Sequence, residues 1–222
     1  GGRTVDITFS APNQGILGKA ASANVLEQLR VFLNGLDRFT QERRRRVPIH
    51  PLYAHLDNPI PVTVTRVFTA PWGTSEPTNT PPLCCLQLFW QTMPGERLED
   101  VDREFFSWLD NLVAAHPGVF AGRPDLLFPI RWLPASTATG AETLIHELSN
   151  CAAAIYGNAP LVQGIEGPCD MFVFHEFGTP AVLWGPRGGN THNPDEYVEI
   201  DSLVSAAATL LAFVGRWCGV AD

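Results

Sequence analysis

Residues 61–68 read PVTVTRVF, residues 83–90 read LCCLQLFW, and these two stretches decide the fold. The first alternates apolar and polar residues strictly, and the second is rich in apolar and aromatic residues, so each is typical of a β-strand. Residues 73–82, which lie between them, contain the glycine, proline and polar residues of turns. The sequence therefore predicts a β-hairpin whose two strands are joined by a long loop.

The segments on either side extend this hairpin to a β-α-β-β-α-β order. Upstream, Thr4–Ser10 predicts a strand, and Ala20–Leu36 predicts a helix whose apolar residues recur every three or four positions. Downstream, Leu98–Ala115 predicts a second amphipathic helix. Leu126–Leu133 predicts a last strand, which Pro129 would confine to an edge or a bulge. This order predicts two helices on one face of a four-stranded antiparallel sheet.

The small, polar stretch ASTATG at 135–140 predicts a linker between a domain at residues 1–135 and a second at residues 136–222. The second part alternates helix and strand, which makes the whole chain α/β (α+β). Its predicted elements are a helix at Glu142–Tyr156, a short strand near Leu161, a helix from Pro168, a strand at Ala181–Trp184 and a helix from Asp201 to Trp217. The last helix is apolar on most faces, which predicts burial. At roughly 85 residues this part is short beside the usual ~100–150 and resembles half of a domain.

Composition excludes several classes of partner. The 222 residues carry a formal net charge of −8 and give a pI near 5.2, which argues against a surface for nucleic-acid phosphates or anionic lipids. The one basic run, Arg43–Arg46, is interpreted as a solvated connection. No stretch approaches about eighteen consecutive apolar residues, and the amino terminus has no basic segment followed by an apolar one. We therefore expect neither membrane insertion nor secretion.

The cysteines are odd in number and show no C-x-x-C spacing, so they are interpreted as reduced thiols. Cys84 and Cys85 are adjacent on a predicted strand, which places their side chains on opposite faces. Reduced thiols fit a cytoplasmic location.

The stretch Gly185–Ile200, GPRGGNTHNPDEYVEI, forms a glycine-rich loop with polar residues after an apolar predicted strand. Loops at the carboxyl ends of strands are where α/β proteins bind ligands. Gly188 and Gly189 allow a close backbone approach, so that amide groups could donate to a substrate carboxylate or oxyanion. His192 is a candidate metal ligand that a carboxylate such as Glu196 could orient, and a merely solvated loop histidine is the alternative.

Other polar residues have structural interpretations. His146 and His175, each followed by glutamate, lie on predicted helices and are interpreted as surface residues, with the alternative that His175 faces the loop. Ser10, Ser22 and Ser202 have no nucleophile-elbow context, so a serine hydrolase is not supported.

Residues 164–207, GIEGPCDMFVFHEFGTPAVLWGPRGGNTHNPDEYVEIDSLVSAA, resemble the last conserved block of a family of zinc metallopeptidases and amidohydrolases. The family includes aminoacylase, acetylornithine deacetylase, succinyl-diaminopimelate desuccinylase and enzymes of the carboxypeptidase G type. The matching positions are Gly167, Asp170, Gly178, Pro180, Gly185, Pro186, His192, Glu196, Tyr197 and Val198. By this resemblance His192 stands where the family places its final metal-binding histidine, and Arg187 and Gly188 lie in the loop that contacts substrate.

Residues 1–135 resemble the family's lid and dimerisation domain, with the turn Pro94–Glu96 before its second helix. The resemblance implies a ferredoxin-like β-α-β-β-α-β lid, then the C-terminal part of an α/β zinc-peptidase-like catalytic domain at 136–222. It also implies a homodimer that forms through the lid.

The lid departs from the family pattern at two places. The first strand is followed by SAPNQG rather than by the lid histidine that many members carry, and Gln91 stands where many have a substrate-binding arginine. Asn79 is the candidate for a loop asparagine that contacts substrate.

The family binds two zinc ions through ligands that mostly precede the lid, and this sequence contains only the final histidine, with neither HExxH nor a second ligand cluster. Because catalytic zinc takes three protein ligands, we expect at most a partial zinc site and no efficient hydrolysis by this chain alone. The resemblance implies that a full-length parent cleaves the amide bond of an N-acyl amino acid or small peptide with zinc-activated water. The alternative is a non-catalytic dimerisation or binding module, a truncated relative.

Overall fold

A computed structural model of the chain describes all residues except 13, 16–23, 71–72, 74–78 and 220–222. It divides into two compact units, one formed by residues 1–135 with 165–168 and the other by residues 136–164 with 169–222. Helices combine with an open sheet, which confirms the predicted α/β (α+β) class. The assignment of 1–135 as a lid domain and of 136–222 as part of a catalytic domain stays a prediction.

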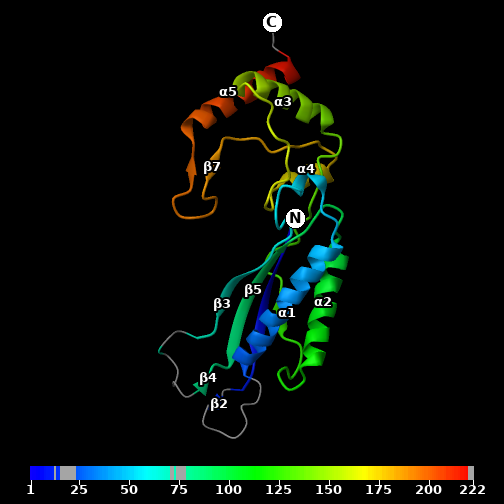
Figure 1. The fold of residues 1–222 in the computed structure, drawn as a ribbon, viewed down its shortest axis with the longest axis vertical. Coiled ribbons are helices and arrows are strands. Elements are labelled where there is room, and N and C mark those ends of the chain that lie inside the picture. Colours follow the sequence, from blue (N-terminus) through cyan, green and yellow to red (C-terminus); the bar gives the residue numbers. More distant parts are fainter. Residues whose placement is uncertain (13, 16–23, 71–72, 74–78, 220–222) are drawn as a thin grey trace. The chain divides into compact units, whose positions relative to one another are not determined.

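The first unit is built on a four-stranded antiparallel sheet in the order β3-β5-β1-β6 (Figure 1). Its strands are β1 (Gly2–Ser10), β3 (Val62–Phe68), β5 (Leu83–Gln91) and β6 (Asp125–Leu127). The predicted hairpin strands β3 and β5 pair directly, with an irregularity between Val64 and Arg66. The last strand is shorter than predicted because Pro129 cannot donate to the ladder, and a single bridge from Gly2 to Leu133 continues the edge.

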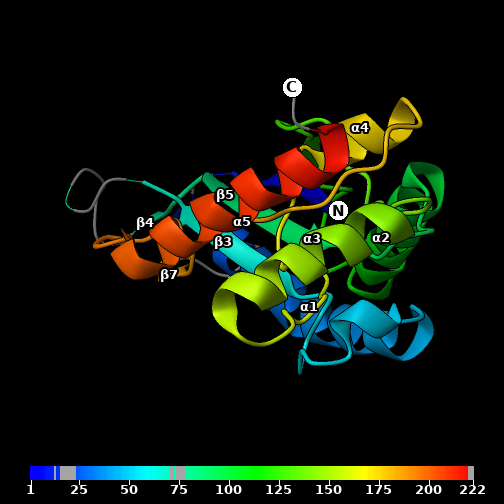
Figure 2. The ribbon, with the colours of Figure 1, turned by 90° about the horizontal axis from the view of Figure 1, so that it is seen from above.

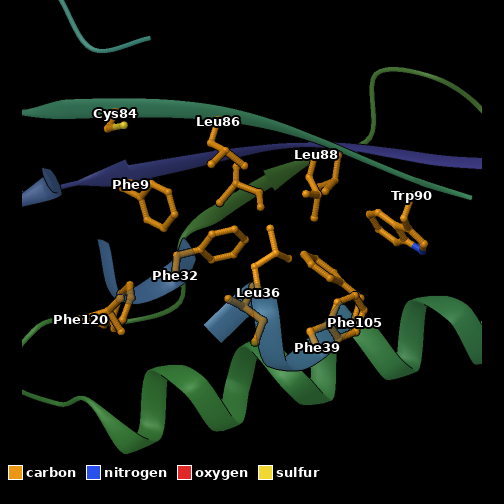
Figure 3. Packing of buried hydrophobic residues seen from close by; sticks show 14 of the residues in the cluster. Phe9, Phe32, Leu36, Phe39, Cys84, Leu86, Leu88, Trp90, Phe105 and Phe120 are labelled. Atoms are coloured by element: carbon orange, nitrogen blue, oxygen red, sulfur yellow. The ribbon is translucent and has the colours of Figure 1, made fainter. Parts of the chain in front are cut away.

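Helices α1 (Val25–Arg46) and α2 (Leu98–Ala115) cover one face of this sheet (Figure 1). Alternate side chains of β1 and β5 point into the space beneath them and meet aromatic residues of both helices (Figure 3). The largest fully buried side chains of this core include Phe9, Phe32, Phe39, Leu86, Leu88, Trp90 and Phe105. Cys84 is buried and Cys85 is exposed, which confirms that the two thiols face opposite sides.

Helix α1 is longer than the sequence predicts, and the interpretation of Arg43–Arg46 as a solvated connection is wrong. The run forms the last turn of the helix, where basic residues complement the helix dipole. The guanidinium of Arg43 is fully buried and donates to Glu104 Oε2 at 2.6 Å and to Glu96 Oε1 at 2.9 Å. Two carboxylates distant in sequence therefore hold this charge inside the unit, whereas Arg44 to Arg46 are exposed.

The start of α1 is capped by Asn24, whose side chain accepts a hydrogen bond from the Glu27 amide at 2.9 Å. The predicted beginning of this helix at Ala20 lies outside the described residues. A short pair of strands, β2 (Gln14–Gly15) and β4 (Asn79–Thr80), and a 3₁₀ turn, η1 (Pro51–Tyr53), complete the first unit.

The second unit contains α3 (Glu142–Tyr156), α4 (Met171–Glu176), α5 (Ile200–Cys218) and a two-stranded hairpin, β7 (Gly188–Gly189) with β8 (Tyr197–Val198). Helices α3 and α5 pack against each other (Figure 2). The N-cap of α5 is Glu199, which lies two residues before the predicted cap at Asp201.

Three predictions for this unit are wrong. Residues near Leu161 and residues 181–184 form no strand, because no described strand lies beside them to complete a ladder. Helix α5 buries only a narrow face rather than most of its surface. By length and composition α5 could also cross a membrane, although one such helix is weak evidence for a span.

Candidate functional site

The loop singled out in the sequence is carried by the β7–β8 hairpin of the second unit. Gly188 pairs with Val198 and Gly189 with Tyr197. A Cβ atom on Gly188 would overlap the Tyr197 carbonyl oxygen, and one on Gly189 would lie 2.8 Å from the Tyr197 ring. Glycine is therefore required at Gly188, where the overlap is with backbone, whereas at Gly189 the exposed Tyr197 ring can move aside. The predicted substrate contact of Gly188 stays a prediction.

The base of the hairpin is fixed to the start of α5 by Ser202, whose side chain is buried. Its hydroxyl accepts a hydrogen bond from the Arg187 amide at 2.9 Å and lies 2.8 Å from the Glu199 carbonyl, to which it can donate. The Glu199 amide donates to the Arg187 carbonyl at 2.9 Å. No structural role was predicted for Ser202, although a serine in the first turn of a helix beside a glycine-rich loop was a signal that could have revealed it.

The side chain of Arg187 is paired within the same structure. Its Nε and Nη2 atoms lie 3.0 and 2.9 Å from Glu199 Oε2. Both side chains are largely exposed, so the pair contributes little stability and a substrate carboxylate could compete for the guanidinium. Its predicted role in substrate binding stays a prediction.

The tip of the hairpin holds three non-glycine residues in the left-handed region, Asn190 at φ 57°, His192 at φ 62° and Asp195 at φ 60°. These residue types tolerate that region better than most, yet three within six positions is a concentration of backbone strain of the kind found at functional loops. A turn bond from the Asn193 amide to the Asn190 carbonyl, 2.8 Å long, supports the conformation.

His192 is exposed, and within the described part of the chain its ring has no hydrogen-bond partner. Glu196 is exposed too, and no hydrogen bond joins it to His192 in this part of the structure. The structure thus places the predicted ligand and the predicted orienting carboxylate in one loop without bringing them into contact. Their roles remain predictions.

The described residues do not fit a complete catalytic metal site. Among them, no group of three or more histidine, cysteine, aspartate or glutamate side chains is placed to hold one ion. Catalytic zinc normally takes three protein ligands and keeps one position for water. The lone imidazole of His192 on its exposed loop supplies one of these three protein ligands.

Asn79 belongs to the first unit, where it lies in β4 opposite Gly15 and is half-buried. Its predicted contact with substrate stays a prediction.

His175 has a structural role that the sequence did not reveal. Its Nε2 lies 3.2 Å from the Ala181 carbonyl, which can only accept, so Nε2 donates, and Nδ1 forms a hydrogen bond with the Ser136 hydroxyl at 2.8 Å. The imidazole ties residue 136 to the segment that begins at residue 181. His146 lies on the exposed side of α3, 3.1 Å from the Asn150 amide nitrogen.

Comparison with known proteins agrees with this fold. The family described as peptidase family M20/M25/M40 matches residues 35–216, most of the chain. The chain belongs to this M20 family. Its members are metallopeptidases and related amidohydrolases, which confirms the resemblance seen in the sequence. No curated protein sequence is significantly similar to the chain.

Solved M20-like structures share the fold of the chain over nearly all its residues. The dipeptidase Dug1p of Saccharomyces cerevisiae is 14% identical with a TM-score of 0.72, over 100% of this chain and 55% of its own. A tripeptidase of Staphylococcus aureus is 12% identical with a TM-score of 0.67, over 97% and 51%. An M20 metallo-carboxypeptidase of Sulfolobus solfataricus is 15% identical with a TM-score of 0.64, over 96% and 57%. The chain thus spans about half the length of these proteins.

Proposed function

We propose that this chain contributes the lid and the C-terminal part of the catalytic domain to a metal-dependent enzyme that hydrolyses amide bonds. Membership of the M20 family supports a peptide or amide hydrolase. The observation that carries the proposal is the β7–β8 hairpin, which holds His192 exposed at a strained tip without an intramolecular partner among the described residues. An imidazole held in this way is available to a ligand from outside the chain.

The proposed substrates are N-acyl amino acids or small peptides. In this proposal His192 is one ligand of a zinc site whose other ligands lie outside the described residues, and Glu196 orients its ring. Arg187 and the Gly188 backbone contact the substrate, and Arg187 would exchange its exposed partner Glu199 for a substrate carboxylate. Asn79 supplies a further polar contact from the lid. The proposed location is the cytoplasm.

The metal requirement is tested by the zinc content of the purified chain after metal loading and dialysis. His192→Ala is the test variant, and His146→Ala on the exposed side of α3 is the matched control. We expect that none of the three proteins retains stoichiometric zinc, because one imidazole does not hold a catalytic ion. If the unsubstituted chain and His146→Ala retained zinc but His192→Ala did not, the chain would contain a complete zinc site. That result would contradict the proposal that the other zinc ligands lie outside the described residues.

The hydrolytic proposal is tested on the chain joined to, or mixed with, a segment that carries the remaining ligands. The measurement is the release of free amine from N-acetyl amino acids and from dipeptides. We expect metal-dependent turnover that His192→Ala abolishes and His146→Ala preserves. Turnover that survives His192→Ala would remove His192 from the site.

The second candidate is a non-catalytic dimerisation module. It is favoured by the absence of a metal-ligand cluster among the described residues and by β3, an edge strand of the sheet whose side chains are mostly exposed. Exposed edge strands pair readily with a second copy. A stable dimer that shows no turnover even with added metal and a complementary segment would favour this function over the first.

A further inference from the structure

Ser136 and His175 form a hydroxyl–imidazole pair within the second unit. Ser136 is the first residue of that unit, and His175 lies near the end of α4. The Ser136 Oγ atom lies 2.8 Å from Nδ1 of His175, well within hydrogen-bonding distance, and has no other partner among the described residues. Both residues are half-buried. The pair is therefore partly shielded from water and still open to a small molecule.

The second ring nitrogen of His175 determines which atom of the imidazole acts as a base. Nε2 lies 3.2 Å from the Ala181 carbonyl oxygen, which can only accept, so Nε2 carries a proton. In the neutral ring, Nδ1 then holds the lone pair and accepts the hydroxyl proton of Ser136. A nucleophile, a base and a third group that orients the base form the arrangement that activates serine in covalent catalysis.

Among the described residues, no other histidine ring contacts a hydroxyl group. The ring of His116 lies 2.9 Å from a backbone carbonyl oxygen, and the ring of His146 lies 3.1 Å from a side-chain amide nitrogen. Neither of these partners is a nucleophile. The contact between Ser136 and His175 is thus set apart from the other histidine contacts by its chemistry.

The backbone beside Ser136 supplies candidate donors for an oxyanion. The amides of Ser136, Thr137 and Ala138 make no hydrogen bond to any described residue. Unpaired amides next to a nucleophile are the groups that stabilise the negative oxygen of a tetrahedral intermediate. The stretch ASTATG at 135–140 contains only small side chains, which suits a small acyl group rather than a large one.

We propose that Ser136 is a nucleophile that small carboxylic esters acylate, with His175 as its general base. The Ser136 oxygen attacks the ester carbonyl carbon while the hydroxyl proton passes to Nδ1 of His175. The bond from that carbon to the alcohol oxygen breaks, and the alcohol leaves with the proton from Nδ1. The acyl group stays on Ser136 until a water molecule, deprotonated by the same nitrogen, releases it as a carboxylic acid.

The reaction of Ser136 is independent of the proposed amide hydrolysis, because an imidazole rather than a metal ion activates the nucleophile. The group on Nε2 of His175 is a carbonyl rather than a carboxylate. A carbonyl orients the ring but carries only a partial negative charge, so it stabilises the imidazolium less than a carboxylate does. We therefore expect acylation to be followed by slow release of the acyl group.

The nucleophile is tested on the purified chain in the presence of EDTA. Two probes are used: p-nitrophenyl acetate, and a fluorophosphonate that loses fluoride to an activated serine oxygen. We expect a burst of about one p-nitrophenolate per chain before slow release, and a phosphonate adduct that mass spectrometry locates on Ser136. Ser136→Ala should abolish both. The matched control is Ser205→Ala, which changes a half-buried serine of α5 and should preserve both.

The base is tested by the rate at which the phosphonate adduct forms on Ser136. His175→Ala should lower this rate about a hundredfold, and added imidazole should restore part of it by replacing the missing base. A histidine that only held the chain in place would not be replaced by imidazole. His146→Ala, on the exposed side of α3, should leave the rate unchanged. Circular dichroism that matches that of the unsubstituted chain will show that the variants are folded.

Several results would overturn the proposal. These are an adduct on a serine other than Ser136, a rate that is unchanged in His175→Ala, a loss in His175→Ala that imidazole does not restore, and labelling that EDTA abolishes. The two functions can fail separately. Release of amine from N-acetyl amino acids requires metal, whereas the ester reaction proceeds with EDTA, so a chain that shows one reaction without the other identifies which function is wrong.

Discussion

The two units of this chain bury their apolar residues to different degrees. In the first unit, α1 and α2 close one face of a four-stranded sheet over a core in which Phe9, Phe105 and Trp90 are fully buried. In the second, α3 and α5 meet through small side chains while Leu211 and Phe177 are 77% and 82% exposed. The comparison teaches that the first unit covers its apolar residues by its own contacts, whereas the described residues of the second unit leave large apolar side chains exposed.

The largest expected effect compares a buried aromatic ring of the first unit with an exposed one of the second. Phe105→Ala should lower the free energy of unfolding by about 3–5 kcal/mol, because the ring packs against Trp90, Phe39 and Trp108. Phe177→Ala should change it by less than about 0.5 kcal/mol. Urea unfolding followed by circular dichroism measures both, and equal effects would break the comparison.

The buried charge of the first unit should give the next largest effect. Arg43→Ala removes the ion-pair partner of Glu96 and one of the two partners of Glu104, which Arg46 also contacts, and should destabilise the unit by about 3 kcal/mol. Arg45→Ala is the matched control on the exposed side of the same helical turn and should be nearly neutral. A small loss in Arg43→Ala would mean that the ion-pair cluster is open to solvent.

A smaller, local effect is expected in the second unit at the base of the hairpin. Ser202→Ala leaves the Arg187 amide without its acceptor and should cost about 1–3 kcal/mol of local stability. Amide hydrogen exchange at Gly188 to Val198 would reveal the loss. Ser205→Ala, which removes only a hydroxyl bond to the Asp201 carbonyl, serves as the control. Exchange that is unchanged in Ser202→Ala would show that the hairpin is held by other contacts.

The smallest effect concerns the adjacent thiols of β5. The pKa of Cys84 is raised above its ordinary value, mainly because the thiol is buried and to a lesser degree because of the charge interaction with neighbouring Cys85. As pH rises from the ordinary pKa towards the raised one, the thiol ionises in the unfolded chain only, so the stability of the first unit should decline across that window. Iodoacetamide should label Cys85 readily and Cys84 only after unfolding. Equal labelling rates in the folded protein would contradict this arrangement.

Much of the fold could be predicted where local pattern and packing agree. The bounds of α2 at Leu98–Ala115 and of α3 at Glu142–Tyr156 coincide with the predicted ones, because amphipathic spacing in each helix matches a face that is buried. The pairing of β3 with β5 also follows from the alternation of their residues. These elements depend on neighbours that the chain itself supplies.

The remaining features of the fold and the site could not be predicted, because they depend on contacts in three dimensions rather than on the local sequence. Arg43 is buried only because Glu96 and Glu104, more than fifty residues away, meet it in space. Residues 181–184 have a strand composition without a described strand to pair with, and α5 is apolar without being covered. At the candidate site, the loop position of His192 was predictable from its glycine-rich surroundings, whereas the hydrogen bonds of Ser202 to Arg187 and Glu199 required the three-dimensional contact.

The central claim is that residues 160–163 and 182–184 of the second unit make no backbone hydrogen bonds to other described residues, in contrast to the strands of the first unit. Amide hydrogen exchange across the whole chain tests this claim most directly. The account predicts strong protection in β1 and β5 of the first unit, with exchange at residues 160–163 and 182–184 close to that of an unstructured chain. Protection of residues 182–184 comparable with that of β5 would show that the isolated chain already pairs them, and would contradict the claim.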